Sequence, residues 1–267
     1  MVASTLTYWR NGNPGERCLG DSLLTADEVK RVLQHLRGGF RLLAELLYGT
    51  GLRLDEVLAL RVRDVAAQGR ELVLRDGAGE VRRAIQLAPR IAEALAAHLA
   101  GVRLLLEDDL VAGQGAALPA DLDVLYPLAG QRWCWQFVFP SAHVRTDSAS
   151  GRLVRSHLEA DLVHRVLAEA GKAAGLRKPV QTHSLRHAFA ARLVGEGVSV
   201  DNLQQAMGHA NRSTTIQYFE VLNAALEGAR APAVAPTRGS RASQRAPLPA
   251  ESRGWTAWAQ MQPGWAG

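Results

Sequence analysis

The chain has 267 residues, of which 47% are hydrophobic and 21% are charged. This composition is that of an ordinary globular protein, and it excludes a fibrous or wholly disordered chain. No run approaches the roughly 18 apolar residues of a membrane-spanning helix, so we expect no membrane association. The chain starts without the pattern of a secretory signal. Its two cysteines, Cys18 and Cys134, lack the spacing of a disulfide framework or zinc site, which predicts a cytoplasmic protein.

The charge balance is basic, with 31 Lys and Arg against 26 Asp and Glu and a formal net charge of +5. All but three of the cationic residues are arginine. The planar guanidinium fork suits phosphate better than the point charge of lysine. The excess of arginine therefore indicates either a nucleic-acid partner or a coding bias toward arginine, and composition alone leaves both open.

The first predicted elements are a loop and a capped helix. Residues 1–22 carry Asn-Gly, Asn-Pro and Gly-Asp pairs and few periodic apolar residues, which predicts a loop or linker. Thr25 and Glu28 have the spacing of a capping box, so we expect a helix that starts at Thr25 and ends at the glycine pair 38–39. Apolar residues at helical spacing predict further helices over about 40–48, 54–60, 89–106, 153–174, 184–195, 199–207 and 213–228.

One region has the pattern of a β-hairpin. Residues 71–75 and 81–87 flank a short Asp- and Gly-containing turn. Residues 111–152 form a long insert that is punctuated by Gly and Pro and contains several aromatic residues. A connection of that length inside a domain is usually either functional or disordered.

These elements predict one mostly helical α+β domain over residues 23–230, with a small antiparallel sheet near its N-terminal end. Residues 231–267 are rich in Pro, Ala, Arg, Ser and Gly without periodicity, which predicts a disordered tail.

Three polar clusters stand out against this scaffold. Arg53 and Glu56 lie where a glycine-punctuated turn enters a helix, His183 to His187 begin another helix with Ser184 as its expected N-cap, and a third cluster runs from Gly208-His209 to Tyr218. Arginines at helix N-termini form a physically sensible anion site. A nearby tyrosine hydroxyl could act as a nucleophile on a phosphodiester, although a lone tyrosine more often serves packing.

A zinc site is the alternative for the histidines. His183 and His187 have the spacing of the H-E-x-x-H pair. Ser184 occupies the position where that motif needs Glu, and the cationic Arg186 lies between the histidines, which opposes metal binding. His157, Asp161 and His164 would share a helical face, but a solvated or core face fits them better. We therefore expect no metal and no cofactor.

Four segments, taken together and in this order, resemble tyrosine recombinases and, within that group, integron integrases. These segments are Leu24 to Val29, Leu47 to Glu56, Thr182 to Ala190, and Met207 to Tyr218. The part of the insert over 117–140 resembles the extra segment that distinguishes integron integrases. The resemblance covers almost all of the chain from Leu24 to about Asn223.

The resemblance implies a role for each matching residue. Arg53 and Arg186 would clamp the scissile phosphate, and His209 would hydrogen-bond to it. His183 would assist proton transfer at the nucleophile. Tyr218 would attack phosphorus, form a 3′-phosphotyrosyl link and release a 5′-hydroxyl. Because the link keeps the phosphoester energy, strand exchange would need neither ATP nor an obligatory metal.

The resemblance also implies partners. The substrate would be DNA recombination sites, including folded single strands whose extrahelical bases could stack on Trp133, Trp135 and His143. Alternatively, the two tryptophans are core residues of the insert. Arg82 and Arg83 are further DNA-binding candidates. The helix after Tyr218 would dock on a neighbouring protomer in a tetrameric synapse, and the protein would act in the bacterial cytoplasm at the nucleoid.

Two departures from the family pattern matter. The family carries a lysine in a Gly-Lys-Gly stretch of the hairpin, where it protonates the leaving 5′-oxygen, and here that position is Ala78. The family's N-terminal DNA-binding domain is also expected to be absent, with residues 1–22 as its linker remnant. A second hypothesis is therefore a truncated, catalytically impaired relic that only binds DNA. A third is an unrelated helical regulator whose matches arose by chance.

Overall fold

A computed structural model describes the protein over residues 23–76, 79–126, 128–148 and 150–230. The linker expected over 1–22, the tail expected over 231–267 and Ala78 all lie outside the described residues. Within those four ranges, no helix is both long enough and apolar enough to cross a bilayer.

The first helices confirm the predicted capping box and correct the predicted helix end. In α2 (Ala26–Gln34), the Thr25 hydroxyl accepts a bond from the Glu28 amide, and the Thr25 amide donates to the Glu28 carboxylate at 2.8 Å. The prediction that the glycine pair ends this helix was wrong. His35 closes α2, and α3 (Gly38–Thr50) begins at the glycines, because the tight reversal between the helices needs the positive φ of 53° at Gly38.

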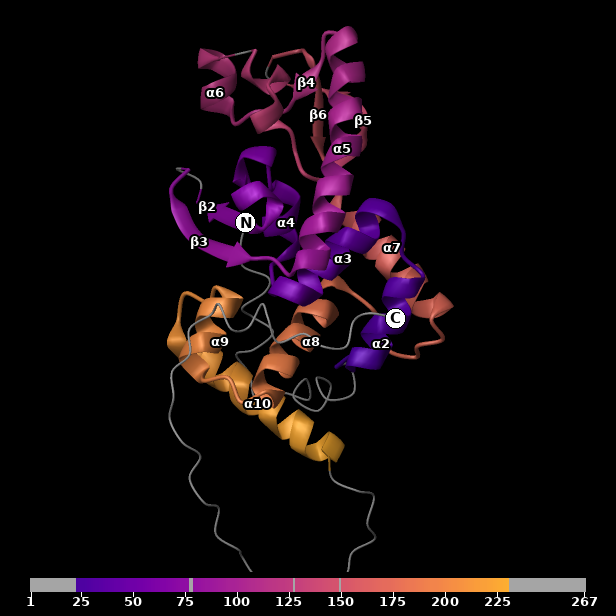
Figure 1. The fold of residues 1–267 in the computed structure, drawn as a ribbon, viewed down its shortest axis with the longest axis vertical. Helices are drawn as coiled ribbons and strands as arrows, with labels where there is room; N and C mark the ends of the chain where they lie inside the picture. Colours follow the sequence, from indigo (N-terminus) through magenta and orange to yellow (C-terminus); the bar gives the residue numbers. More distant parts are fainter. Residues whose placement is uncertain (1–22, 77–78, 127, 149, 231–267) are drawn as a thin grey trace, which may run out of the picture.

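Helix α3 is the centre of the larger core cluster. Leu43, Leu46 and Leu47 are fully buried, and Tyr48 is 6% exposed. A helix that is apolar on nearly all sides must be covered on all sides. Helices α2, α5 and α8 pack around it (Figure 1). Helix α4 (Leu54–Ala59) follows after a short turn, as predicted.

The predicted hairpin is confirmed and has a third strand that was not predicted. Strands β1 (Val65–Ala66), β2 (Glu71–Arg75) and β3 (Val81–Gln86) form an antiparallel sheet in the order β1-β2-β3. Leu72 and Leu74 of β2 point into the core, and residues of β3 alternate between exposed and half-buried. The hairpin extends to one side of the domain (Figure 1).

Helix α5 (Pro89–Val111) is longer than predicted and carries the insert at its far end. Its C-terminal part projects beyond the helical core and packs against β4 (Gly115–Ala116), with β6 (Leu153–His157) and β5 (Pro140–Thr146) nearby, while α6 (Ala120–Leu125) lies apart from it on the far side of the strands (Figure 1). These strands form a second sheet in the order β4-β6-β5, with β4 and β6 parallel. The described part of the insert therefore contributes β4 and β5 to a sheet that β6 completes.

The prediction of a helix from residue 153 was wrong. Residues 153–157 form β6, which bonds to β4 on one side and β5 on the other, and α7 (Ala160–Ala173) begins only afterwards. His157 therefore lies on a strand, apart from the helical face that Asp161 and His164 were expected to share with it.

A buried ion pair joins the second sheet to α5. Arg155 of β6 donates from Nε to the Asp109 carboxylate at 2.6 Å and from Nη2 at 2.5 Å. Its Nη1 donates to the carbonyls of Ser141 and Ala142 at 2.7 and 3.0 Å. Asp109 and Arg155 are only 3% and 7% exposed. The guanidinium thus ties α5, β5 and β6 together.

Three helices complete the domain. Helices α8 (Thr182–Gly195), α9 (Val200–Met207) and α10 (Arg212–Arg230) pack together and bury the smaller core cluster (Figure 1). The N-cap of α8 is Gln181; Ser184 is at the third helical position, so its prediction as the N-cap was wrong. In the single chain, α10 lies on α8 and α9 of its own molecule, and Leu222 is fully buried there.

Candidate active site

A glycine turn brings Arg53 close to α8. Gly51 ends α3 in a left-handed conformation with φ 65°. A Cβ atom at this position would lie 2.4 Å from the ring of Phe189, so only glycine allows the turn to approach α8 this closely. Arg53 follows as the N-cap of α4, where its amide donates to Glu56 at 2.8 Å and its guanidinium lies 3.6 Å from the same carboxylate.

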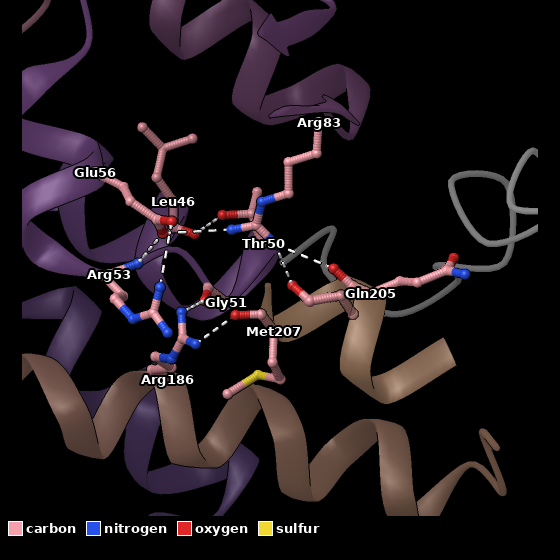
Figure 2. A network of polar contacts seen from close by, with 10 residues as sticks. Leu46, Thr50, Gly51, Arg53, Glu56, Arg83, Arg186, Gln205 and Met207 are labelled. Carbon is pink, nitrogen blue, oxygen red and sulfur yellow. Dashed lines mark hydrogen bonds and ion pairs between the residues drawn. The ribbon is translucent and has the colours of Figure 1, made fainter. Parts of the chain in front are cut away.

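Arg186 is the buried centre of the site and is 7% exposed. Its guanidinium donates to the carbonyl of Gly51 at the end of α3 and to that of Met207 at the end of α9, the latter at 2.5 Å (Figure 2). Burial, with the nearby charge of Arg53, lowers the pKa of Arg186 to about 10, so the group stays cationic at neutral pH. The Arg53 and Arg186 side chains lie side by side in Figure 2.

Arg83 reaches the same region from strand β3. Its Nη1 donates to the carbonyls of Gln205 and Ala206 at 3.2 and 2.8 Å, and its Nη2 lies 3.3 Å from the Glu56 carboxylate (Figure 2). Arg83 therefore ties the hairpin to the end of α9. Arg82, its exposed neighbour, lines a cleft of about 1020 Å³ with Arg83 and His209.

Tyr218 lies on α10 and is 7% exposed. Its hydroxyl is hydrogen-bonded to Nδ1 of His187, and the two ring centroids are 5.5 Å apart. Burial raises the pKa of Tyr218 above its usual value, and the charge of Arg186 opposes this only in part. The phenol is therefore protonated at neutral pH.

Two further imidazoles complete the cluster. His209 bonds through Nδ1 to the Thr215 hydroxyl at 3.1 Å, and its ring lies edge-on to Tyr218 with centroids 5.8 Å apart. Burial and then the charge of Arg186 lower the pKa of His209 to about 4. The ring of His183 lies 6.4 Å from that of His187, and burial and Arg186 lower the pKa of His183 as well.

The structure thus brings the five predicted residues, Arg53, His183, Arg186, His209 and Tyr218, to one place from α4, α8, α10 and the turn after α9. Sequence reasoning missed the contact of His187 with the phenol, having considered this histidine only as a metal ligand. Across the described ranges, no three His, Cys, Asp or Glu side chains are grouped to hold a metal ion.

The insert aromatics carry arginine partners of their own. The Arg63 guanidinium lies 3.9 Å from the ring centroid of Trp135, and that of Arg103 lies 5.0 Å from Trp133. Both rings are half-buried. They are therefore neither fully exposed, as for stacking on bases, nor fully buried, as for core residues of the insert. His143 is exposed on β5. Cation–π contacts of this kind hold the rings in place from one side.

The protonation state of His187 predicts how stability depends on pH. Burial, with the charges of His183 and Arg186, lowers the pKa of His187 from 6.5 to about 4. Between these values the unfolded chain binds more protons at this residue, so its contribution to stability is full above pH 6.5 and is lost as the pH falls toward 4. We expect the thermal midpoint of unfolding to fall over this range, and less steeply in His187→Phe. Equal slopes in the two proteins would contradict the assignment.

The fold is that of a tyrosine recombinase catalytic domain. Residues 22–224 match the Phage integrase family, and the chain belongs to that family.

Several relatives agree with this assignment. An "Integrase/recombinase" of Escherichia coli is 39% identical over 211 residues, which cover 79% of this chain and 63% of the relative. The tyrosine recombinase XerD of Agrobacterium fabrum is 33% identical over 200 residues, which cover 75% of this chain and 52% of the relative. The crystal structure of XerA recombinase matches with a TM-score of 0.52 and 26% identity, over 79% of this chain and 64% of that one. The chain thus spans less than two thirds of the length of these relatives.

Proposed function

We propose that the protein performs site-specific DNA recombination through a covalent 3′-phosphotyrosyl intermediate at Tyr218. The observation that carries this proposal is the position of the Tyr218 hydroxyl in one cluster with Arg186, His187 and His209. A phenol beside a fixed guanidinium and neutral imidazoles has what nucleophilic attack on a phosphodiester requires.

The charges of the cluster favour the binding of an anion. Arg53 and Arg186 lie close enough for each charge to act on the other, and Glu56 is the acidic group between Arg53 and Arg83. Cations held this close repel one another, and a bound phosphate relieves that repulsion. The same cations stabilise the charge that develops on the phosphate oxygens during attack. Attack by Tyr218 conserves the phosphoester energy, so the released 5′-hydroxyl of another strand can reverse the step without ATP.

We further propose that the insert gives an integron-type specificity for folded single-stranded sites. Support comes from the ordered second sheet at the end of α5, with Trp133 and Trp135 half-buried beside it and His143 exposed on β5. Arg82 would contact the backbone from the cleft. Self-association into a tetrameric synapse would use the part of α10 that follows Tyr218, which would have to leave its place on the protein's own core. The setting would be the bacterial cytoplasm, at the nucleoid.

The test is capture of the covalent intermediate. The full chain is incubated with a nicked or hairpin recombination site, so that the released fragment diffuses away, and the mixture is separated on a denaturing gel. We expect a protein–DNA band with the wild type and none with Tyr218→Phe. A band of equal strength in both would show that Tyr218 is not the nucleophile.

The second candidate is a recombinase relic that binds DNA without cleaving it. Residues 71–87 contain no lysine, and Arg83 is engaged by Glu56 and two carbonyls. Arginine stays protonated and is a poor general acid. Ala78→Lys is therefore expected to raise the rate of adduct formation by about 10²–10⁴-fold, the usual value of general-acid catalysis. An unchanged rate at equal DNA occupancy would show that the missing acid is not what limits cleavage.

A further inference from the structure

We propose that His187 is the catalytic base for Tyr218: it holds the phenol and accepts its proton as the oxygen–phosphorus bond forms. This inference rests on the proposed function, and it gives to His187 the step that the family resemblance assigns to His183.

The first support is geometric. The Tyr218 hydroxyl is hydrogen-bonded to Nδ1 of His187, with the rings held by the packing of α10 on α8. A protonated phenol donates its hydrogen, so Nδ1 accepts it and the ring proton is on Nε2. His187 directly follows Arg186 in α8, so the base and the phosphate-binding guanidinium come from consecutive residues of one helix.

The second support is the protonation state. Burial lowers the pKa of His187 to about 4 and raises that of Tyr218, so in the free protein the proton stays on the phenol. After burial, the neighbouring His183 and the charge of Arg186 add to the lowering of this pKa. A phosphodiester at Arg186 places a negative charge beside the imidazole and raises its pKa. His187 therefore becomes a better base when DNA binds, and it stays neutral and weakly basic in the free protein.

The step balances as follows. The Tyr218 oxygen forms its bond to phosphorus while its O–H bond breaks and the proton moves to Nδ1 of His187. The bond from phosphorus to the 5′-oxygen breaks, and its electron pair leaves with that oxygen, which takes a proton from a water molecule. The resulting hydroxide removes the proton from the imidazolium, which restores neutral His187 and the water.

The kinetic test uses two variants of different chemistry. His187→Phe keeps a ring and removes both the hydrogen bond and the base, while His187→Asn can keep an acceptor near the position of Nδ1 without a useful base. Under single-turnover conditions on nicked DNA, we expect both to form the adduct about 10²–10³-fold more slowly than the wild type, as for loss of a general base. His35→Asn, at an exposed position that closes α2, is the matched control and should be unchanged.

A substrate with sulfur in place of the leaving 5′-oxygen separates this role from general-acid catalysis. A thiolate leaves without a proton, so this substrate relieves a defect at the leaving group and not one at the nucleophile. We expect the defect of His187→Phe to persist with it. Recovery to the wild-type rate would overturn the inference, as would equal rates of His187→Phe and the wild type on ordinary DNA. Failure of the wild type on both substrates would overturn the proposed function itself, and this inference with it.

A measurement that needs no activity tests the hydrogen bond. Nitrogen NMR of the full chain distinguishes the two neutral imidazole tautomers. We expect His187 to carry its proton on Nε2 at pH 7 and to lose this preference in Tyr218→Phe. A proton on Nδ1 in the wild type would overturn the inference, because that nitrogen could not then accept from the phenol.

Discussion

Arg186→Ala is expected to lower the rate of adduct formation by at least about 10³-fold. Removing one preorganised donor from a developing oxyanion commonly costs about 10²–10³-fold, and arginine supplies more than one donor as well as its charge. Two of its five N–H donors hold the carbonyls of Gly51 and Met207, which fixes the guanidinium and, among the contacts that the structure describes, leaves other donors for a phosphate. Single-turnover adduct formation at saturating protein measures the effect.

Arg53→Ala is the matched variant, because the Arg53 side chain is 47% exposed and Arg186 is buried. We expect both variants to lose activity, but only Arg186→Ala to lower the thermal midpoint, since it leaves two carbonyls without their donor. Arg186→Lys keeps the charge and loses the fork, and should recover only part of the rate. Wild-type adduct rates in folded Arg186→Ala would contradict the assignment of the phosphate site.

Asp109→Ala is expected to destabilise the protein by about 3–5 kcal/mol. Removing one partner of a buried ion pair leaves the other charge buried without compensation. Arg155 would keep its bonds to the carbonyls of Ser141 and Ala142 and lose the carboxylate that neutralises it. Urea unfolding, followed by circular dichroism, gives the free energy of unfolding.

The exposed neighbour Asp108 offers the control for this prediction. Asp108→Ala should change the free energy of unfolding by no more than about 0.5 kcal/mol, as is usual for surface substitutions. The double variant Asp109→Leu/Arg155→Met removes both charges and should recover much of the loss. If Asp109→Ala cost no more than Asp108→Ala, the ion pair would not be what holds the second sheet to α5.

The parts of the fold that local chemistry decides were predictable from the sequence. Thr25 and Glu28 satisfy each other's backbone amides within one turn, so their spacing alone identified the start of α2. The hairpin formed by β2 and β3 is equally local. The second sheet was missed because β4 has two residues and pairs with β6 almost forty positions later, and no alternating pattern marks either strand.

The site was predictable to a similar degree. The five residues taken from the family resemblance lie together in the candidate active site, although no local pattern in the sequence places Tyr218 beside Arg186. The partners that hold them were not predicted, because they come from distant segments. His187 and Tyr218 are 31 residues apart, and Arg83 reaches carbonyls 122 and 123 residues away. Such contacts depend on how α8, α9 and α10 pack against the hairpin and not on spacing.

The most direct test of the central claim is to identify the residue that becomes attached to DNA. The adduct is isolated after denaturation and digested with protease and nuclease, and the peptide that carries the remaining nucleotide is sequenced by mass spectrometry. We predict the nucleotide on Tyr218, joined through its 3′-phosphate, with a free 5′-hydroxyl on the released strand. A nucleotide on any other residue, or one joined through its 5′-phosphate, would contradict the account.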